Sequence, residues 1–243
     1  MKLIYACLIT LKGGVILIYN KKVTAVILAA GNSVRYGQNK NKNLEIINGK
    51  QVLFYSLTEF DKNKYIDNII IAVKKDEIPV VESIIKKENL QKKVDIVVGG
   101  DSRKASVYNS IKSTNADIVI IHDGARAFIK QDYINKCVES MNEFKGVAIG
   151  VKSKDTIKIT DENGLVINTT NRSNTWLIQT PQCFDRDTLL KMHEKYKTKD
   201  VTDDCMLLEE GDYKVKILEG DYSNIKITTY DDLNLMKELM KQN

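Results

Sequence analysis

The sequence has little proline, cysteine or histidine, and each shortage narrows what the protein can be. Only two prolines occur among 243 residues, so no proline-rich linker divides the chain. The four cysteines form no Cys-x-x-Cys pair and no zinc-ligand spacing, which favours reduced, buried thiols and a cytoplasmic protein. The two histidines, His122 and His193, belong to no Ser-His-Asp spacing, which disfavours hydrolytic triad chemistry.

Long apolar runs and dense basic stripes are also missing. Residues 1–22 are apolar, but Lys12, Gly13 and Gly14 interrupt them, so they lack the ~20 apolar residues of a membrane span. No small-x-small site marks a signal peptide. We expect an extension outside the core fold, either a hairpin that turns at Gly13-Gly14 or a segment added by the choice of start codon. The formal charge of +5 is scattered, which disfavours nucleic acid as a partner and suits a small anionic substrate.

Short apolar runs alternate with amphipathic segments through the first two thirds of the chain. The predicted strands are residues 24–28, 68–73, 95–98, 117–121 and 146–151. The predicted helices between them are residues 51–61, 77–88, 103–113 and 131–143. Strands that are apolar on both faces and alternate with helices predict an α/β fold, Rossmann-like, with a mostly parallel sheet flanked by helices.

The pattern changes at residues 155–170, where two alternating runs flank the turn signal Asp161-Glu162-Asn163-Gly164. These runs have few apolar residues for a core of their own. We therefore expect a protruding β-arm, about residues 152–175, that packs on a second copy of the chain. The alternative is a simple edge hairpin.

The last third of the chain returns to strands and helices. The predicted strands are residues 176–180, 215–218 and 224–228, and the predicted helices are residues 185–197, 203–210 and 230–241. Thr202 is a natural N-cap for the second of these helices. We expect residues 23–243 to form one domain.

Three polar clusters follow predicted strands. They are Ala29-Ala30-Gly31 with Arg35 and Lys42, Gly99 to Arg103 with Ser106, and His122 to Arg126. Small residues let the backbone approach a ligand, and the two cations can neutralise a triphosphate. Ligands of open α/β sheets bind at the carboxyl ends of the strands, so the three clusters predict one site. Neither GxGxxG nor a Walker loop occurs, which disfavours a nicotinamide-dependent reductase.

Within these clusters Asp123 is the candidate metal ligand, because Mg²⁺ usually takes one or two carboxylates plus substrate phosphates. We expect His122 to pack beside its strand and His193 to lie in solvent. Ser102 can act simply as the cap of the helix that follows it.

The ordered motifs resemble those of the 2-C-methyl-D-erythritol 4-phosphate cytidylyltransferase family. They are AAG with Arg35 and Lys42, GGDSR with Ser106, HDGAR, DT at Asp155-Thr156, NR with Trp176 and QTPQ, TDD, and NIKIT. The resemblance runs from about Val23 to the C-terminus, and ribitol-5-phosphate cytidylyltransferases share most of these motifs. It implies transfer of a cytidylyl group from CTP to a polyol phosphate, with release of pyrophosphate, a divalent cation such as Mg²⁺ and a homodimer. A nucleotide-binding protein without catalysis is a further alternative.

The resemblance also implies roles for individual residues. CTP would be bound by Ala29, Ala30, Gly31, Arg35, Lys42, Gly100, Asp101, Ser106 and Gly124. The sugar phosphate would be bound by Asp123, Arg126, Thr156, Arg172, Thr180, Thr202 and Lys226. Arg35, Lys42 and Lys226 would be catalytic, Asp123 would hold Mg²⁺, and Arg172 would reach the partner's site from the arm.

Several positions depart from the family pattern. Ser33 stands where the family often has glycine, and Asn43 stands where glutamine usually follows the lysine. Asn41 lies in a segment that commonly carries proline, and Ala127 replaces another proline. We expect these changes to loosen the loop around Lys42.

Overall fold

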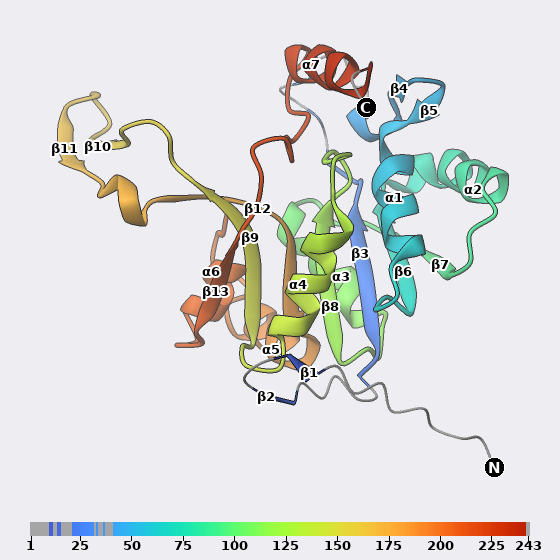
Figure 1. Ribbon diagram of the computed structural model, residues 1–243, viewed down its shortest axis with the longest axis horizontal. Coiled ribbons are helices and arrows are strands. Elements are labelled where there is room, and N and C mark those ends of the chain that lie inside the picture. The colour runs from blue at the N-terminus through green and yellow to red at the C-terminus, as the bar shows by residue number, and fades with distance from the viewer. Residues whose placement is uncertain are drawn as a thin grey trace.

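The computed structural model describes residues 10–11, 14–15, 21–31, 33, 36 and 41–241. A seven-stranded sheet crosses the middle of the molecule (Figure 1). Its strands, in spatial order, are β13 (Val215–Glu219), β9 (Gly146–Lys152), β12 (Trp176–Asp185), β8 (Ile118–Asp123), β3 (Val23–Leu28), β6 (Asn68–Val73) and β7 (Lys93–Val98). β12 is antiparallel to both neighbours, and every other pairing is parallel. The predicted Rossmann-like, mostly parallel sheet is confirmed.

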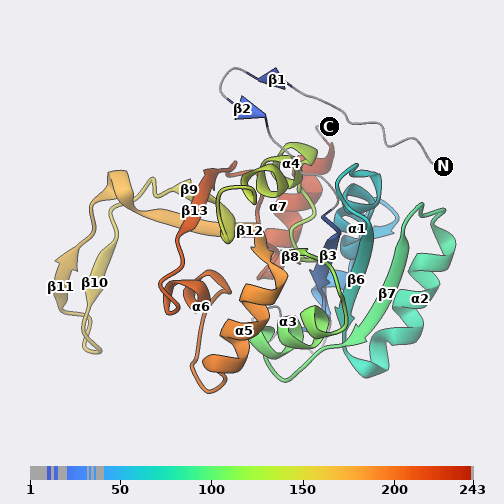
Figure 2. The same cartoon turned by 90° about the horizontal axis from the view of Figure 1, so that it is seen from below.

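Helices cover both faces of this sheet (Figure 2). One face packs on α1 (Val52–Lys62), α2 (Ile78–Lys87) and α4 (Gln131–Ser140), and the other on α3 (Arg103–Lys112), α5 (Arg186–Lys195) and α6 (Cys205–Glu209). Successive residues of β3 alternate between the two cores, with Ala25 and Ile27 in the first and Val26 in the second. Burial of each large apolar side chain contributes ~1.5–3 kcal/mol to the stability of the fold. Because both faces of these strands are covered, nearly every residue in them is apolar.

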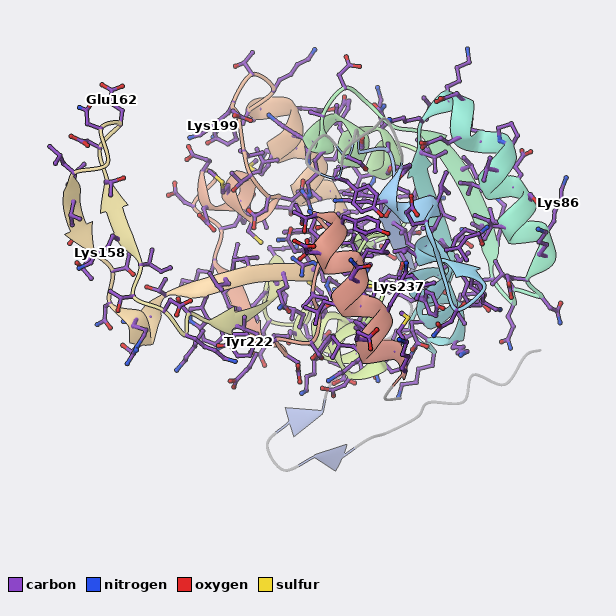
Figure 3. All side chains as sticks on the ribbon, turned by 90° about the horizontal axis from the view of Figure 1, so that it is seen from above. Lys86, Lys158, Glu162, Lys199, Tyr222 and Lys237 are labelled. Carbon is purple, nitrogen blue, oxygen red and sulfur yellow. The ribbon has the colours of Figure 1, made fainter. Side chains whose placement is uncertain are left out.

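The β-arm projects from the body beyond β9 and β12 (Figure 1). It consists of β10 (Lys158–Thr160) and β11 (Val166–Thr169), paired antiparallel, and Glu162 and Lys158 mark it in Figure 3. Its turn is closed by Asp161, whose Oδ1 accepts hydrogen bonds from the backbone of Asn163 and Leu165, while Gly164 takes the positive φ of 82°. The predicted protruding arm and its turn are confirmed, and its packing on a second copy stays a prediction.

A third, smaller core supports the carboxyl edge of the sheet. It joins α7 (Tyr230–Lys241) to the hairpin β4 (Ile46–Ile47) and β5 (Lys50–Gln51) through Ile47, Ala127, Ile227 and Leu233. Residues 224–228 were predicted to form a strand, and that prediction is wrong. They cross the carboxyl edge of the sheet as irregular backbone. The Ile227 N–H donates a hydrogen bond to the Ala125 carbonyl, which fixes them there.

Two sequence-based expectations about polar residues fail near α6. Thr202 does not cap this helix; the N-cap position belongs to Asp204, and the Thr202 hydroxyl contacts the Met206 sulfur. His193 is buried, with 3% of its surface exposed, because Asp204 gives it a hydrogen-bond partner inside the protein. His122 packs in the interior as expected.

The N-terminal strands β1 (Thr10–Leu11) and β2 (Gly14–Val15) pair antiparallel. The predicted turn at Gly13-Gly14 falls partly on residues 12–13, which lie outside the described residues. Cys137, Cys183 and Cys205 are buried free thiols, as expected for reduced cysteines. No helix in the described part of the chain has both the length and the hydropathy to span a membrane.

Candidate active site

A cleft opens where β3, β7 and β8 end, and we call it the carboxyl-edge cleft. Most of the lining comes from the three predicted clusters, and the rest from Leu28, Asn43 and residues 224–228. It consists of Leu28, Ala30, Gly31, Lys42, Asn43, Gly100, Asp101, Ser102, Arg103, Ser106, Asp123, Ala125 and Lys226. The clusters lie far apart in the sequence, and the parallel sheet brings them together because its strands end at one edge.

Small residues let two strand ends close on each other at this edge. A Cβ added to Gly99 would lie 2.3 Å from the Ala30 Cβ, and one added to Gly100 would lie 2.4 Å from the Ala105 Cβ. The Ser106 hydroxyl accepts a hydrogen bond from the Gly100 N–H and donates to the Ser102 carbonyl. The Ser102 side chain caps α3 through the Ala105 N–H, as predicted. The backbone of this wall is therefore rigidly placed against the cleft.

Lys42 stands on a short 3-10 turn, η2 (Lys42–Leu44), that is tied to the end of β3. The side-chain amides of Asn41 and Asn43 both donate to the Ala29 carbonyl, and Asn41 also donates to Glu77. Both asparagines are buried, with 8% and 2% of their surfaces exposed. These amides hold the turn that carries Lys42, and residues 37–40, the part of the predicted loose loop just before it, lie outside the described residues. Ala127 packs in the third core.

Asp123 is the centre of charge in the cleft. Its Oδ2 lies 2.7 Å from the Lys226 Nζ and 3.9 Å from the Arg126 Nε, and its Oδ1 lies 3.6 Å from the Arg103 Nε. Burial alone would raise the pKa of Asp123, but the charges of these three cations outweigh it and hold the pKa below its ordinary value. Asp123 is therefore an ionised carboxylate at neutral pH, surrounded by an excess of positive charge.

The backbone of Asp123 is fixed by a buried pair, His122 and Thr180. The His122 Nε2 faces the Arg126 carbonyl at 3.2 Å, so this nitrogen carries the proton and Nδ1 is an acceptor. The Thr180 hydroxyl then donates to Nδ1 at 3.1 Å and accepts the Asp123 N–H at 3.0 Å. Burial lowers the pKa of His122 to about 4, which keeps the imidazole neutral and this arrangement intact.

The predicted site residues fall into three groups. Those that line the cleft are Ala30, Gly31, Lys42, Gly100, Asp101, Ser106, Asp123 and Lys226. Those that lie behind its lining are Ala29, Gly124, Arg126 and Thr180. Arg126 donates a hydrogen bond to the Asn224 carbonyl, and a Cβ added to Gly124 would lie 3.0 Å from the Asn43 Oδ1. Those that are exposed and outside this cleft are Thr156, Arg172 and Thr202. Arg35 lies outside the described residues.

Sequence reasoning gave no role to Arg103, which lines the cleft beside Asp123. The available signal was its place in the GGDSR cluster, at the first turn of a helix that begins at the cleft. That signal is weak, because Ser102 accounts for the start of the helix by itself.

A divalent cation fits the cleft if substrate phosphates supply most of its ligands. In the described part of the chain, no three His, Cys, Asp or Glu side chains are grouped to hold a metal by themselves. Asp123 offers a single ionised carboxylate at the cleft wall, and one carboxylate with several phosphate oxygens is a common donor set for Mg²⁺.

The sequence and fold match known proteins over nearly the whole chain. Residues 23–242 match the family model described as 2-C-methyl-D-erythritol 4-phosphate cytidylyltransferase. The chain belongs to this family. A relative of that name from Clostridium botulinum (strain 657 / Type Ba4) is 41% identical over 225 residues, which are 91% of this chain and 98% of the relative. Another from Caldanaerobacter subterraneus subsp. tengcongensis is 42% identical over 216 residues, covering 87% and 95%.

Solved structures of the family have the same fold. The 4-diphosphocytidyl-2C-methyl-D-erythritol synthase of Anaerococcus prevotii DSM 20548 superposes with a TM-score of 0.82 at 33% identity, covering 91% of this chain and 96% of that one. The 2-C-methyl-D-erythritol 4-phosphate cytidylyltransferase of Francisella tularensis superposes with a TM-score of 0.73 at 28% identity, covering 89% and 99%. Family membership thus rests on sequence and structure together.

Proposed function

We propose that this chain transfers the cytidylyl group of CTP to 2-C-methyl-D-erythritol 4-phosphate, in the non-mevalonate route to isoprenoids. The products are 4-diphosphocytidyl-2-C-methyl-D-erythritol and pyrophosphate. The observation that carries the proposal is the cleft, in a chain of this family, where Lys226, Arg103 and Arg126 converge on Asp123 beside Lys42. An excess of cations suits two phosphorylated substrates that meet there.

The reaction needs no covalent enzyme intermediate. A phosphate oxygen of the sugar attacks the α-phosphorus of CTP in line, and the bond from that phosphorus to the bridging oxygen of the β-phosphate breaks as pyrophosphate leaves. Catalysis of this kind depends on positioning and on stabilising the charge of the pentavalent phosphorus. In the proposed roles, Lys42 and Arg35 stabilise the triphosphate, and Lys226 stabilises the attacking phosphate and the reacting centre.

The remaining walls have supporting roles in this proposal. Ala29, Ala30 and Gly31 lie against the nucleotide, and Gly100, Asp101, Ser106 and Gly124 shape its base and ribose pocket. Because the Thr180 hydroxyl is engaged with Asp123 and His122, Thr180 supports the site by fixing Asp123. Arg126, Thr156 and Thr202 complete the sugar-phosphate side. A bound Mg²⁺, held by Asp123 and phosphate oxygens, would neutralise charge on the triphosphate.

The active unit in this proposal is a homodimer joined through the β-arm. Ile159, Leu165, Val166 and Ile167 expose between 47% and 69% of their surfaces along the arm. Such apolar side chains on an extension without a core of its own favour packing against a second copy. Arg172, on η4 (Arg172–Asn174) in the arm, is exposed and does not line the cleft of its own chain, which supports a role in the partner's cleft. The buried free thiols support a cytoplasmic setting.

Purified protein assayed with CTP and Mg²⁺ against a panel of sugar phosphates tests the reaction itself. We expect pyrophosphate release with 2-C-methyl-D-erythritol 4-phosphate and little or none with ribitol 5-phosphate. Activity only with ribitol 5-phosphate would replace the proposed acceptor. Binding of CTP without turnover on any acceptor would instead indicate a nucleotide-binding protein.

Mixing two inactive variants tests the shared site. We expect Lys42→Ala and Arg172→Ala homodimers to be nearly inactive, and a mixture exchanged through unfolding and refolding to recover about a quarter of wild-type activity. The recovery follows because each mixed dimer of a symmetric pair contains one cleft with both native residues. A mixture no more active than its components would place Arg172 outside the partner's cleft.

A further inference from the structure

A row of polar and charged side chains leads from the cleft into the buried interior of the protein. It begins at Asp123, continues through Arg103 and Asp204, and ends at His193. The Arg103 Nε lies 3.6 Å from the Asp123 Oδ1, and the Arg103 Nη1 lies 2.5 Å from the Asp204 Oδ2. The His193 Nε2 lies 3.1 Å from the Asp204 Oδ1. None of the roles proposed above uses Asp204 or His193.

The placement of Asp204 is not explained by helix capping. Asp204 occupies the N-cap position of α6 but makes no capping hydrogen bond with its side chain. Its neighbour Asp203 accepts the Met206 N–H instead, and also accepts a hydrogen bond from the Gln182 amide. The Asp204 carboxylate is thus turned inward, where none of its surface is exposed.

Both oxygens of Asp204 are committed to partners. Burial would raise the pKa of Asp204, but the Arg103 charge and the hydrogen bonds of His193 and Arg103 outweigh it and lower the pKa. A buried ionised carboxylate is costly unless its partners are well placed. The His193 ring lies near that of Tyr108 on α3, with the two ring centroids 6.0 Å apart.

The result of this arrangement is that Arg103 is shared between two carboxylates. The stronger contact is with Asp204, so the guanidinium is held back from Asp123. If Asp204 lost its charge, the planar fork of Arg103 would be free to pair with both oxygens of Asp123, as arginine does with isolated carboxylates. Lys226, which pairs with the Asp123 Oδ2 at 2.7 Å, would then lose its place.

We propose that Asp204, supported by His193, is a positioning residue that keeps Arg103 from pairing with both oxygens of Asp123 and so keeps the second Asp123 oxygen for Lys226. The inference rests on the proposed function, because its effect is read in turnover. It assigns Asp204 no contact with either substrate. Its action is through Arg103, so the two residues must be coupled.

A double-mutant cycle on turnover tests that coupling. We expect Asp204→Asn to lower kcat about tenfold or more, since small displacements of reacting groups are costly, while KM for CTP changes less. In an Arg103→Ala background, the same substitution is expected to change kcat less than twofold. Independent, multiplying effects in the two backgrounds, or wild-type kcat in Asp204→Asn, would overturn the proposal.

Matched variants separate positioning from stability. Asp61→Asn removes another buried carboxylate, one that accepts backbone N–H groups of Gln91 and Lys92 away from the cleft, and should lower Tm without changing kcat. Asp204→Glu should recover part of kcat.

If Asp204→Asn does not fold, His193→Leu decides the question. It is expected to lower kcat a few-fold, and His193→Gln to restore it; an unchanged kcat in a folded His193→Leu protein would overturn the proposal. An inactive wild-type protein would refute the proposed function instead, so the two failures are distinguishable.

Discussion

Replacing Lys42 by alanine is expected to lower kcat by two or more orders of magnitude while the protein stays folded. Lys42 lines the cleft, and its turn is fixed to the Ala29 carbonyl by the amides of Asn41 and Asn43. A cation held in advance where charge develops needs little reorganisation in the transition state, and removing one such contact typically costs about 10²–10³ in kcat. Steady-state pyrophosphate release at saturating CTP and sugar phosphate measures the effect.

Two further variants make this test specific. Lys86→Ala removes a lysine from the last turn of α2, on the outside of the molecule (Figure 3), and should leave kcat unchanged. Circular dichroism should show Lys42→Ala folded, because the anchors of the turn are its neighbours. A Lys42→Ala protein with turnover near that of the wild type would contradict the role given to this turn.

The sheet could be predicted because its signals are local. Strands such as β3 and β8 are buried on both faces, so short, mostly apolar runs mark them directly. The parallel order then places Gly31, Gly100 and Asp123 at one edge. The β-arm could be predicted equally well, because its turn depends on residues within the turn itself.

Features that depend on distant partners could not be predicted. Residues 224–228 have a strand-like pattern, yet they leave the sheet because the Asn224 amide is bound by Gln179 and Thr180, 44 or more positions earlier. His193 lies on a helix with many charged residues, and its partner in the interior is Asp204. The contact of Arg103 with Asp204 joins residues 101 positions apart. Polar networks of this kind produce no periodic pattern in the sequence, because each member needs only one correctly placed partner.

Exchanging Lys226 for methionine is the second change from which we expect a large loss, about two orders of magnitude in kcat. Methionine keeps the length and apolar stem of the side chain but removes the ammonium group that lies 2.7 Å from the Asp123 Oδ2. The backbone position should survive, because it depends on Ile227, which is fully buried and bonded to the Ala125 carbonyl. The loss should therefore appear in turnover with little change in Tm.

Lys226→Arg separates the effect of positive charge from the effect of side-chain geometry. Arginine keeps the charge, but its planar fork is shaped to pair with both oxygens of Asp123, where it would compete with Arg103. We expect the Lys226→Arg protein to have less than a tenth of wild-type kcat, because the position of the charge matters as well as its sign. Full activity in Lys226→Arg would mean that positive charge alone suffices, and full activity in Lys226→Met would remove Lys226 from the chemistry. The same steady-state assay, with Tm measured alongside, separates these outcomes.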